Sequence, residues 1–300
     1  MVPPDTNISG SAIWGSQPSI DPIRRQVFIA TGNTYQLPDE FEACLNQTAN
    51  ITVIRQGLTN DPCLPRNVFQ ESVLALDLDA WNLACAGGLL GTPPPGAALQ
   101  CPENPGPDAD FGMAPAFVLG SEHTPDGLDI VVLGQKNGNM YALSAQAGMT
   151  LWAVATGPDG LEGGLTWGVA VDEAAVYYTA GGKTVISSSA FGAARLKDGA
   201  ILWQTPVPNN GTSFVTPAVV NDVVLNGVTG SFVPGSLFPE GPGSFTPLDK
   251  KTGRILEVKE LDAYFHGGFA AVHEYVMFGT GYGGLDAPSA GSFQVWKIKD

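Results

Sequence analysis

A repeat of about fifty residues constrains the fold of this chain more than any other feature. The first part of each repeat contains small residues, an apolar strand, a turn and a second apolar strand that ends in glycine. Copies of this unit occupy residues 11–32, 111–134, 164–182, 213–230 and 266–284. Such regular spacing of short strands predicts an all-β protein built from similar sheets.

A second unit follows the middle copies and completes the repeat. It contains an aliphatic strand, a glycine turn and a strand that often carries tryptophan, as in residues 140–157 and 194–207. Four antiparallel strands per repeat make one propeller blade, and each blade needs neighbours to cover its two apolar faces. Trp152 and Trp203 hold matching places in this unit, so we expect both to be wedges between blades. We predict a single partial β-propeller domain over residues 1–300, with about five blades of which the first and last are incomplete.

The first part of the chain departs from this rhythm. Residues 36–70 and 82–108 are predicted to be long loops, and loops of this length commonly form or cover a site. The strand at residues 73–79 runs directly into Ala80 and Trp81, with no glycine turn and no tryptophan strand after it. We therefore expect the first blade to lack part of its sheet.

The composition agrees with short strands and tight turns, because the chain has 38 glycines, 24 prolines and only 14% charged residues. It has 29 acidic against 14 basic residues, a formal net charge of −15. So negative a surface repels phosphate backbones and anionic lipid, which argues against a nucleic-acid or membrane-surface partner. No apolar run approaches the roughly 20 residues of a membrane span.

The cysteines indicate an oxidising compartment. The four cysteines form neighbouring pairs around loops rich in Asn, Pro and Gly, which favours the local disulfides Cys44–Cys63 and Cys85–Cys101. Three pairings are formally possible, and metal binding is an alternative that no Cys-x-x-Cys pair supports.

Asparagine acceptor triplets point to the same compartment. Triplets for N-linked sugar begin at Asn7, Asn46, Asn50 and Asn210. We therefore expect a secreted or extracellular glycoprotein. The N-terminus has neither the basic start nor the apolar stretch of a signal peptide, so we expect the true N-terminus to lie upstream.

Four segments contain residues suited to binding a cofactor. The segment at residues 12–33 places Trp14 before one strand and Asn33 after the next, and an amide oxygen is a ligand that calcium accepts. Lys136 lies in Gly-Gln-Lys-Asn-Gly-Asn, Thr166 and Trp167 lie in Gly-Gly-Leu-Thr-Trp-Gly, and the fourth segment is Gly-Thr-Gly-Tyr-Gly-Gly at residues 279–284. Three of these residues also have a simpler structural interpretation: Trp14 as a blade wedge, Asn33 as a turn residue and Lys136 as a solvated hairpin residue.

The repeat and these four segments together resemble the quinoprotein alcohol dehydrogenases, and in particular the polyvinyl-alcohol-dehydrogenase-type branch. The resemblance covers most of residues 10–284 and only the later blades of the family's eight-bladed propeller. It implies pyrroloquinoline quinone on the propeller axis. Trp14 would lie against the quinone ring, Asn33 would ligate calcium, Lys136 would reach the quinone oxygens, and Thr166 and Trp167 would contact the cofactor.

The implied activity is oxidation of a small or polymeric alcohol, with electrons passing to a separate acceptor. We assign the base to Asp110, because it precedes the inner strand predicted at residues 111–118. Asp108 and Asp79 are alternatives, and Trp81 is followed by Asn82 where the family has Trp-Asp. The family's metal-binding glutamate and adjacent-cysteine ring belong to an N-terminal half that this chain lacks, and no haem attachment motif occurs.

A second function remains open. A propeller can keep its fold, lose catalysis and serve as a binding or scaffold module. The three histidines, His123, His266 and His273, are scattered and form no metal-binding set, so we expect all of them to be structural. An open arc of blades would also expose two blade faces, which predicts self-association.

Overall fold

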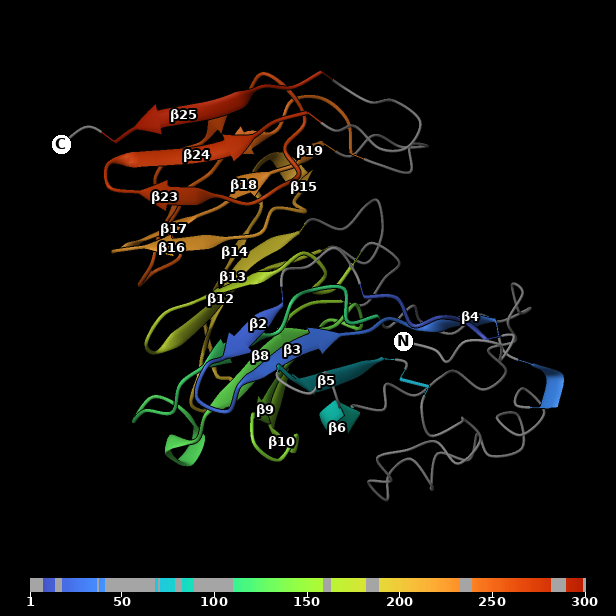
Figure 1. Cartoon of the computed structure of the whole chain (residues 1–300). Helices are drawn as coiled ribbons and strands as arrows, with labels where there is room; N and C mark the ends of the chain where they lie inside the picture. Colours follow the sequence, from blue (N-terminus) through green and yellow to red (C-terminus); the bar gives the residue numbers. More distant parts are fainter. Residues whose placement is uncertain are drawn as a thin grey trace.

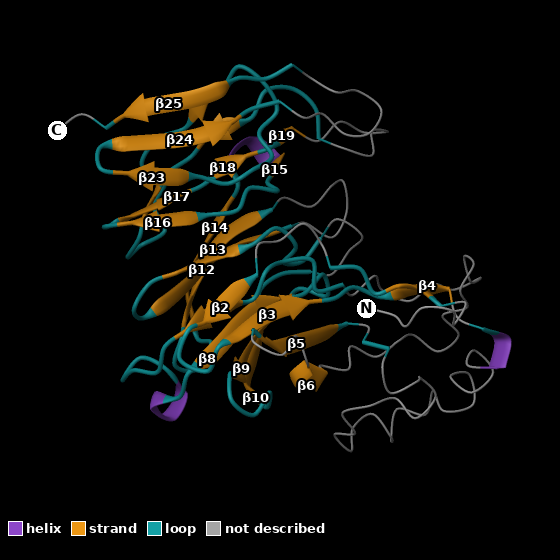
Figure 2. Ribbon diagram, in the orientation of Figure 1, coloured by secondary structure: helices purple, strands orange, loops and turns teal. Residues whose placement is uncertain are grey.

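The computed structural model describes residues 8–13, 18–36, 38–40, 68–69, 71–78, 83–88, 110–158, 163–181, 189–231, 239–281 and 290–298. In these ranges the chain consists mainly of short antiparallel strands, which form a series of sheets (Figures 1 and 2). Two 3-10 turns are also present, η1 at Pro125–Gly127 and η2 at Pro208–Asn210. None of the described helical segments has the length and apolar character that a transmembrane helix requires.

Three blades are four-stranded sheets whose strands lie in chain order. Blade I contains β2 (Ser19–Asp21), β3 (Gln26–Ala30), β5 (Ser72–Asp77) and β6 (Leu83–Gly88). Blade II contains β7 (Ala116–Val118), β8 (Ile130–Gly134), β9 (Asn139–Ser144) and β10 (Thr150–Ala155). Blade III contains β11 (Val169–Val171), β12 (Ala175–Ala180), β13 (Ala190–Arg195) and β14 (Ile201–Pro206).

The later blades are less regular. Blade IV consists of two short sheets: β16 (Ala218–Val220), β17 (Val223–Leu225) and β21 (Leu248–Asp249), and β18 (Gly227–Val228), β20 (Ser244–Phe245) and β22 (Lys259–Glu260). Blade V has three described strands, β23 (Ala270–Val272), β24 (Tyr275–Gly279) and β25 (Phe293–Lys297), and lies at one end of the stack in Figure 1. Two small ladders pair β1 (Ser9–Gly10) with β4 (Thr34–Gln36) and β15 (Gly211–Thr212) with β19 (Gly230–Ser231).

These sheets confirm the predicted all-β blades but correct the expectation for the first one. Blade I has four strands, because β6 pairs with β5 through Ala75 and Cys85. β6 therefore occupies part of the range 82–108 that was predicted to be a loop. Cys44, Cys63 and Cys101 lie outside the described residues, so the predicted disulfides stay predictions.

The strand sequences match their places in the blades. All residues of β8 and β12 are buried, as expected for middle strands covered by a blade on each face. In β14, by contrast, Trp203 is the buried residue and most of the others are exposed. The inner strands β2, β7, β11 and β16 contact one another in succession, which places consecutive blades side by side.

The two matching tryptophans are wedges between blades, as predicted. The Trp152 indole Nε1–H donates a hydrogen bond to the Leu196 carbonyl oxygen at 2.8 Å. In the same way, Trp203 Nε1–H donates to the Lys250 carbonyl oxygen at 3.0 Å. Each tryptophan is only 9% exposed, so its apolar ring fills the space between two blades while its polar atom is satisfied.

Candidate functional site

A buried carboxylate joins three parts of the chain on the inner-strand side of blades I and II. Asp110 Oδ1 accepts a hydrogen bond of 2.6 Å from the Asn33 backbone N–H. Asp110 Oδ2 lies 3.3 Å from Lys136 Nζ, and the two side chains are only 2% and 4% exposed. Two predicted site residues, Asn33 and Lys136, therefore meet the carboxylate that was predicted to be the base.

Asn33 is positioned by a local ladder at the end of β3. The Ser11 N–H donates to the Asn33 carbonyl oxygen at 2.6 Å, and the Gly32 N–H donates to the Ala12 carbonyl oxygen at 2.9 Å. The segment that leads to Trp14 thus lies beside Asn33, although Trp14 itself is outside the described residues. The alternative bases Asp79 and Asp108 are outside them as well.

Lys136 is positioned by the turn between β8 and β9. Its backbone N–H donates to the Asp110 carbonyl oxygen at 3.1 Å, so residues 110 and 136 are joined through both backbone and side chain. The whole residue is 3% exposed. The alternative interpretation of Lys136 as a solvated hairpin residue is therefore wrong, because a buried ammonium needs a charge partner and here it has Asp110.

Thr166 and Trp167 begin blade III, next to this cluster in the fold. The Leu165 N–H donates to the Gln135 carbonyl oxygen at 3.1 Å, which brings the segment against the Lys136 turn. Thr166 is 2% exposed, and its hydroxyl donates to the Gly163 carbonyl oxygen at 3.1 Å. The described contacts thus place Thr166 and Trp167 beside the cluster through the backbone, while their side chains make other contacts.

The cluster also contains a buried acceptor. Asn33 Oδ1 has almost no solvent contact, and it has no hydrogen-bond partner among the residues that the structure describes. An amide oxygen and a carboxylate are both donor types that a hard cation accepts, and here they belong to two residues joined by a hydrogen bond. Across the described ranges, no group of three or more His, Cys, Asp or Glu side chains gathers to bind a metal.

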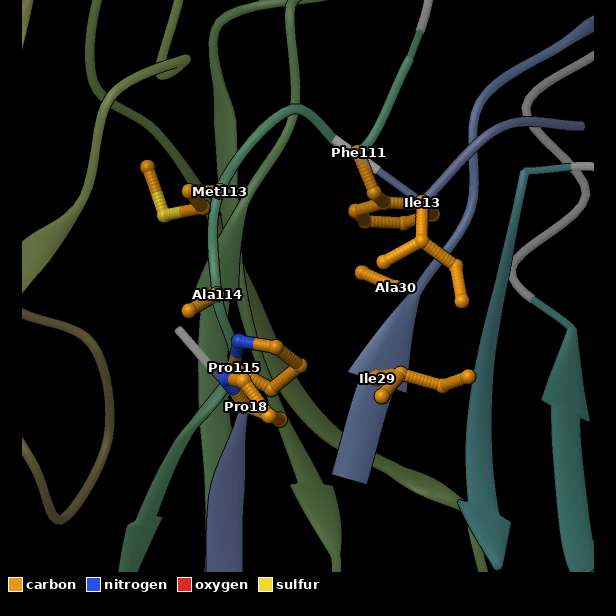
Figure 3. Close-up of a pocket in the computed structure, with 8 residues that line it drawn as sticks. All are labelled: Ile13, Pro18, Ile29, Ala30, Phe111, Met113, Ala114 and Pro115. Carbon is orange, nitrogen blue, oxygen red and sulfur yellow. The ribbon is translucent and has the colours of Figure 1, made fainter. Parts of the chain in front are cut away.

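An apolar pocket lies beside Asp110, between blades I and II (Figure 3). Its lining includes Ile13, Ile29, Phe111 and Met113. Because Phe111 directly follows Asp110, the polar cluster and the apolar wall share one segment of backbone. A carboxylate next to an apolar surface can bind the polar and apolar parts of one ligand.

One group of site residues was missed from the sequence. Phe214 and His266 contact the Trp167 ring from the segments that begin blades IV and V. His266 was expected to be structural, and Phe214 was not singled out. The repeat could have identified them, because Trp167, Phe214 and His266 each precede the first strand of a blade.

Consecutive four-stranded blades with buried polar residues at their inner ends define the protein as a β-propeller. The sequence profile of the PQQ_2 family, described as "Outer membrane protein assembly factor BamB", matches residues 136–295, and the chain belongs to this family.

Two curated relatives agree with the predicted resemblance. The polyvinylalcohol dehydrogenase of Pseudomonas sp is 29% identical over 267 residues, and that of Sphingopyxis sp. is 26% identical over 269 residues. Each alignment covers 83% of this chain and 35% of the relative. The chain thus spans about a third of the length of the curated relatives it matches.

Solved structures share the fold. The quinohemoprotein alcohol dehydrogenase from Comamonas testosteroni aligns over 97% of this chain and 50% of its own, with a TM-score of 0.61 and 13% identity. BamB from Moraxella catarrhalis aligns over 94% of this chain and 57% of its own, with a TM-score of 0.50 and 15% identity. The predicted propeller class and the resemblance to the quinoprotein alcohol dehydrogenases are both confirmed.

Proposed function

We propose that this chain forms part of the active site of a pyrroloquinoline quinone-dependent alcohol dehydrogenase that passes electrons to a separate acceptor. The observation that carries the proposal is that the buried Asp110 carboxylate accepts a hydrogen bond from Asn33 and forms an ion pair with Lys136. Oxidation of an alcohol needs a base for the hydroxyl proton and a positive environment for a reduced, anionic acceptor. Asp110 and Lys136 can supply these two functions.

The residues present fit both calcium and an anionic quinone. Calcium binds six to eight oxygen atoms, and Asn33 Oδ1 and the Asp110 carboxylate are two suitable donors. The remaining donors would come from the quinone, from water or from other parts of the protein. Lys136 would bind quinone oxygens, and Trp14, Thr166 and Trp167 would contact the rest of the cofactor. When bound, the quinone supplies the two-electron acceptor that the side chains cannot provide.

Asp110 is held in position to accept a proton. The Asn33 backbone N–H bonds one of its carboxylate oxygens and the Lys136 ammonium bonds the other, which fixes the plane of the group. A carboxylate has about four lone-pair sites, so it can accept the O–H of an alcohol in addition to these bonds. The apolar side chains around the pocket beside Phe111 would contact the apolar part of that alcohol.

The test measures cofactor capture and turnover separately. Purified chain is mixed with calcium and pyrroloquinoline quinone, passed through a gel-filtration column, and assayed for bound quinone absorbance and for dye-linked oxidation of ethanol or polyvinyl alcohol. Asp110→Asn is expected to keep bound quinone but to lose oxidation by about 10²- to 10⁴-fold, the usual contribution of a positioned base. Asn33→Ala is expected to raise the calcium concentration that capture requires, because one calcium donor is lost.

Asp198→Asn is the matched control, because Asp198 is an exposed carboxylate paired with Arg195 in a turn. It should leave capture and turnover unchanged. An Asp110→Asn variant that oxidises alcohol at the native rate would remove Asp110 from its proposed role.

A second function is a non-catalytic binding or scaffold module. The matched family profile favours this second function, because the description of the profile names an assembly factor and not a dehydrogenase. This function predicts that the native chain captures no quinone at saturating calcium, or captures it without turnover. Capture followed by turnover would exclude it.

We further propose that the protein is a secreted glycoprotein, and Asn210 offers a test of the glycosylation. Asn210 begins an Asn-Gly-Thr triplet, ends the 3-10 turn η2 and is exposed, so a modifying enzyme could reach it. Expressed through a eukaryotic secretory pathway, the chain should carry sugar that a glycosidase removes and that Asn210→Gln lacks at this site. A native chain that shows no sugar at Asn210 by peptide mass analysis would contradict this.

A further inference from the structure

An aromatic group separate from the Asp110 cluster connects the beginnings of three consecutive blades. The Trp167 ring lies 4.3 Å from the His266 ring and 5.6 Å from the Phe214 ring, measured between centroids. Phe214 and His266 also contact each other at 5.5 Å, so the three rings form a closed triangle. Tyr264 contacts His266 at 6.2 Å from the side of blade V.

The backbone of Trp167 is fixed by blade IV. The Thr216 hydroxyl donates a hydrogen bond of 2.5 Å to the Trp167 carbonyl oxygen. Gly168 follows with a φ of +139°, and a Cβ at this position would lie 2.6 Å from Thr216 Cγ2. The glycine is therefore required for this close approach. The direction of the indole still depends on its side-chain torsions, and these depend on the rings that contact it.

His266 has the geometry to set that direction. Its ring is nearly perpendicular to the indole, at 86°, an edge-to-face arrangement that aromatic pairs favour. Burial lowers the pKa of His266 below its ordinary value, so the imidazole is neutral at neutral pH and contacts the indole as an uncharged ring. Phe214 tilts against the indole at 48°.

We propose that His266 is a positioning residue, which holds the Trp167 ring from blade V in the orientation that the cofactor contacts. This inference rests on the proposed function for its role in cofactor binding, but the contact between the two rings can be tested without cofactor. This role of His266 is not indicated by the sequence, in which the three histidines lie far apart.

The first measurement uses near-ultraviolet circular dichroism of the chain without cofactor. The contribution of Trp167 is the spectrum of the chain minus that of Trp167→Phe. His266→Ala should remove most of this contribution, and His266→Phe should retain it because an aromatic ring remains. In the Trp167→Phe background, His266→Ala should cause little further change. His273→Asn is the matched control, because His273 is an exposed turn residue with a φ of +52° that asparagine accepts.

The second measurement is the affinity for pyrroloquinoline quinone with calcium, followed by fluorescence quenching. His266→Ala should bind about three- to tenfold more weakly, the factor that corresponds to one lost aromatic pair, and His266→Phe should recover most of the loss. A loss of thermal stability alone would not be reversed in this ring-specific way.

The possible outcomes separate the inference from the proposed function. An unchanged Trp167 dichroism in His266→Ala overturns the inference, and so does an altered dichroism with native quinone affinity. If the native chain binds no quinone, the proposed function fails together with the role of His266 in cofactor binding. In that case the dichroism still decides whether His266 fixes the Trp167 ring.

Discussion

The Asp110 carboxylate accepts a hydrogen bond of 2.6 Å from the backbone N–H of Asn33, a residue 77 positions away in the sequence. This bond joins the end of β3 in blade I to the segment that begins blade II. Its acceptor is also the partner of Lys136, so one side chain connects the two blades and neutralises a buried cation. The stability of this part of the propeller and the geometry of the proposed site therefore depend on the same group.

The first prediction concerns this ion pair. Lys136→Met should lower the free energy of unfolding by about 3–5 kcal/mol, because it leaves the Asp110 carboxylate buried without its cation. The double variant Asp110→Asn/Lys136→Met should lose less than the sum of the two single variants, because neither charge is then left alone. Urea unfolding of the four proteins gives the coupling energy.

Lys197→Met is the control for this cycle, because Lys197 is an exposed lysine whose Nζ bonds only a backbone oxygen among its described contacts. Its change should stay within about 0.5 kcal/mol. Additive effects in the cycle would mean that the Asp110–Lys136 contact does not contribute as a buried pair.

The repeat was sufficient to predict the blades and the wedge tryptophans, because Trp152 and Trp203 recur at one position of a regular pattern. It was not sufficient for β6, which has no tryptophan and no preceding glycine turn. That strand forms because β5 pairs with β3 along one edge and has a second edge to satisfy, where its residues Ser72–Leu76 pair with Leu83–Gly88. Tertiary pairing here supplies what the local sequence does not indicate.

The site was predictable to a similar degree. Asp110 was selected because it precedes an inner strand, and the structure places it against Asn33 and Lys136; its role as base stays a prediction. The triangle of Trp167, Phe214 and His266 was missed, because a repeat gives the position of a residue within a blade but not the direction of its side chain.

The second prediction concerns Asp21, which connects blades I and II through Arg24. Arg24 bonds Asp21 at 2.7 Å and Asp129 of blade II at 2.6 Å. Burial favours the neutral form of Asp21, but hydrogen bonds from the Arg24 backbone and guanidinium and from the Ile23 N–H outweigh it, and the pKa of this carboxyl is lowered.

Because the folded-state pKa is lowered, Asp21 contributes stability above the unfolded-state pKa and loses it as the pH falls through the folded-state pKa. Asp21→Asn should therefore lower the free energy of unfolding by about 1–3 kcal/mol at pH 7. The difference between native and variant should shrink as the pH falls below about 4. Chemical unfolding at several pH values measures it, and a constant difference down to about pH 2 would contradict the linkage.

The third prediction tests the wedge of Trp203. Gly253 has a φ of +69°, and a Cβ there would lie 2.5 Å from Cδ2 of the Trp203 ring. Gly253→Ala should cost about 2–4 kcal/mol, from backbone strain of about 1 kcal/mol and from overpacking against the indole. Gly241→Ala is the matched control, because Gly241 has a φ of +84° and an added Cβ there would meet nothing within 4 Å. Equal losses in urea unfolding would show that the tryptophan contact is not tight.

The fourth prediction concerns the exposed apolar surface of blade V. Phe293, Val295 and Val272 are 72%, 52% and 48% exposed, and β25 pairs only with β24 in the described part of the chain. An apolar strand with an open edge promotes association between copies. The purified chain should therefore self-associate as its concentration rises from about 1 to 100 μM, and Phe293→Lys should reduce this self-association, because a lysine on an edge strand opposes sheet extension.

Leu202→Lys is the control, since Leu202 is 50% exposed on β14 of blade III, within the series of sheets. Sedimentation velocity distinguishes the cases: a native chain that stays monomeric over this range, or equal effects of the two lysine substitutions, would show that the blade V surface does not cause association.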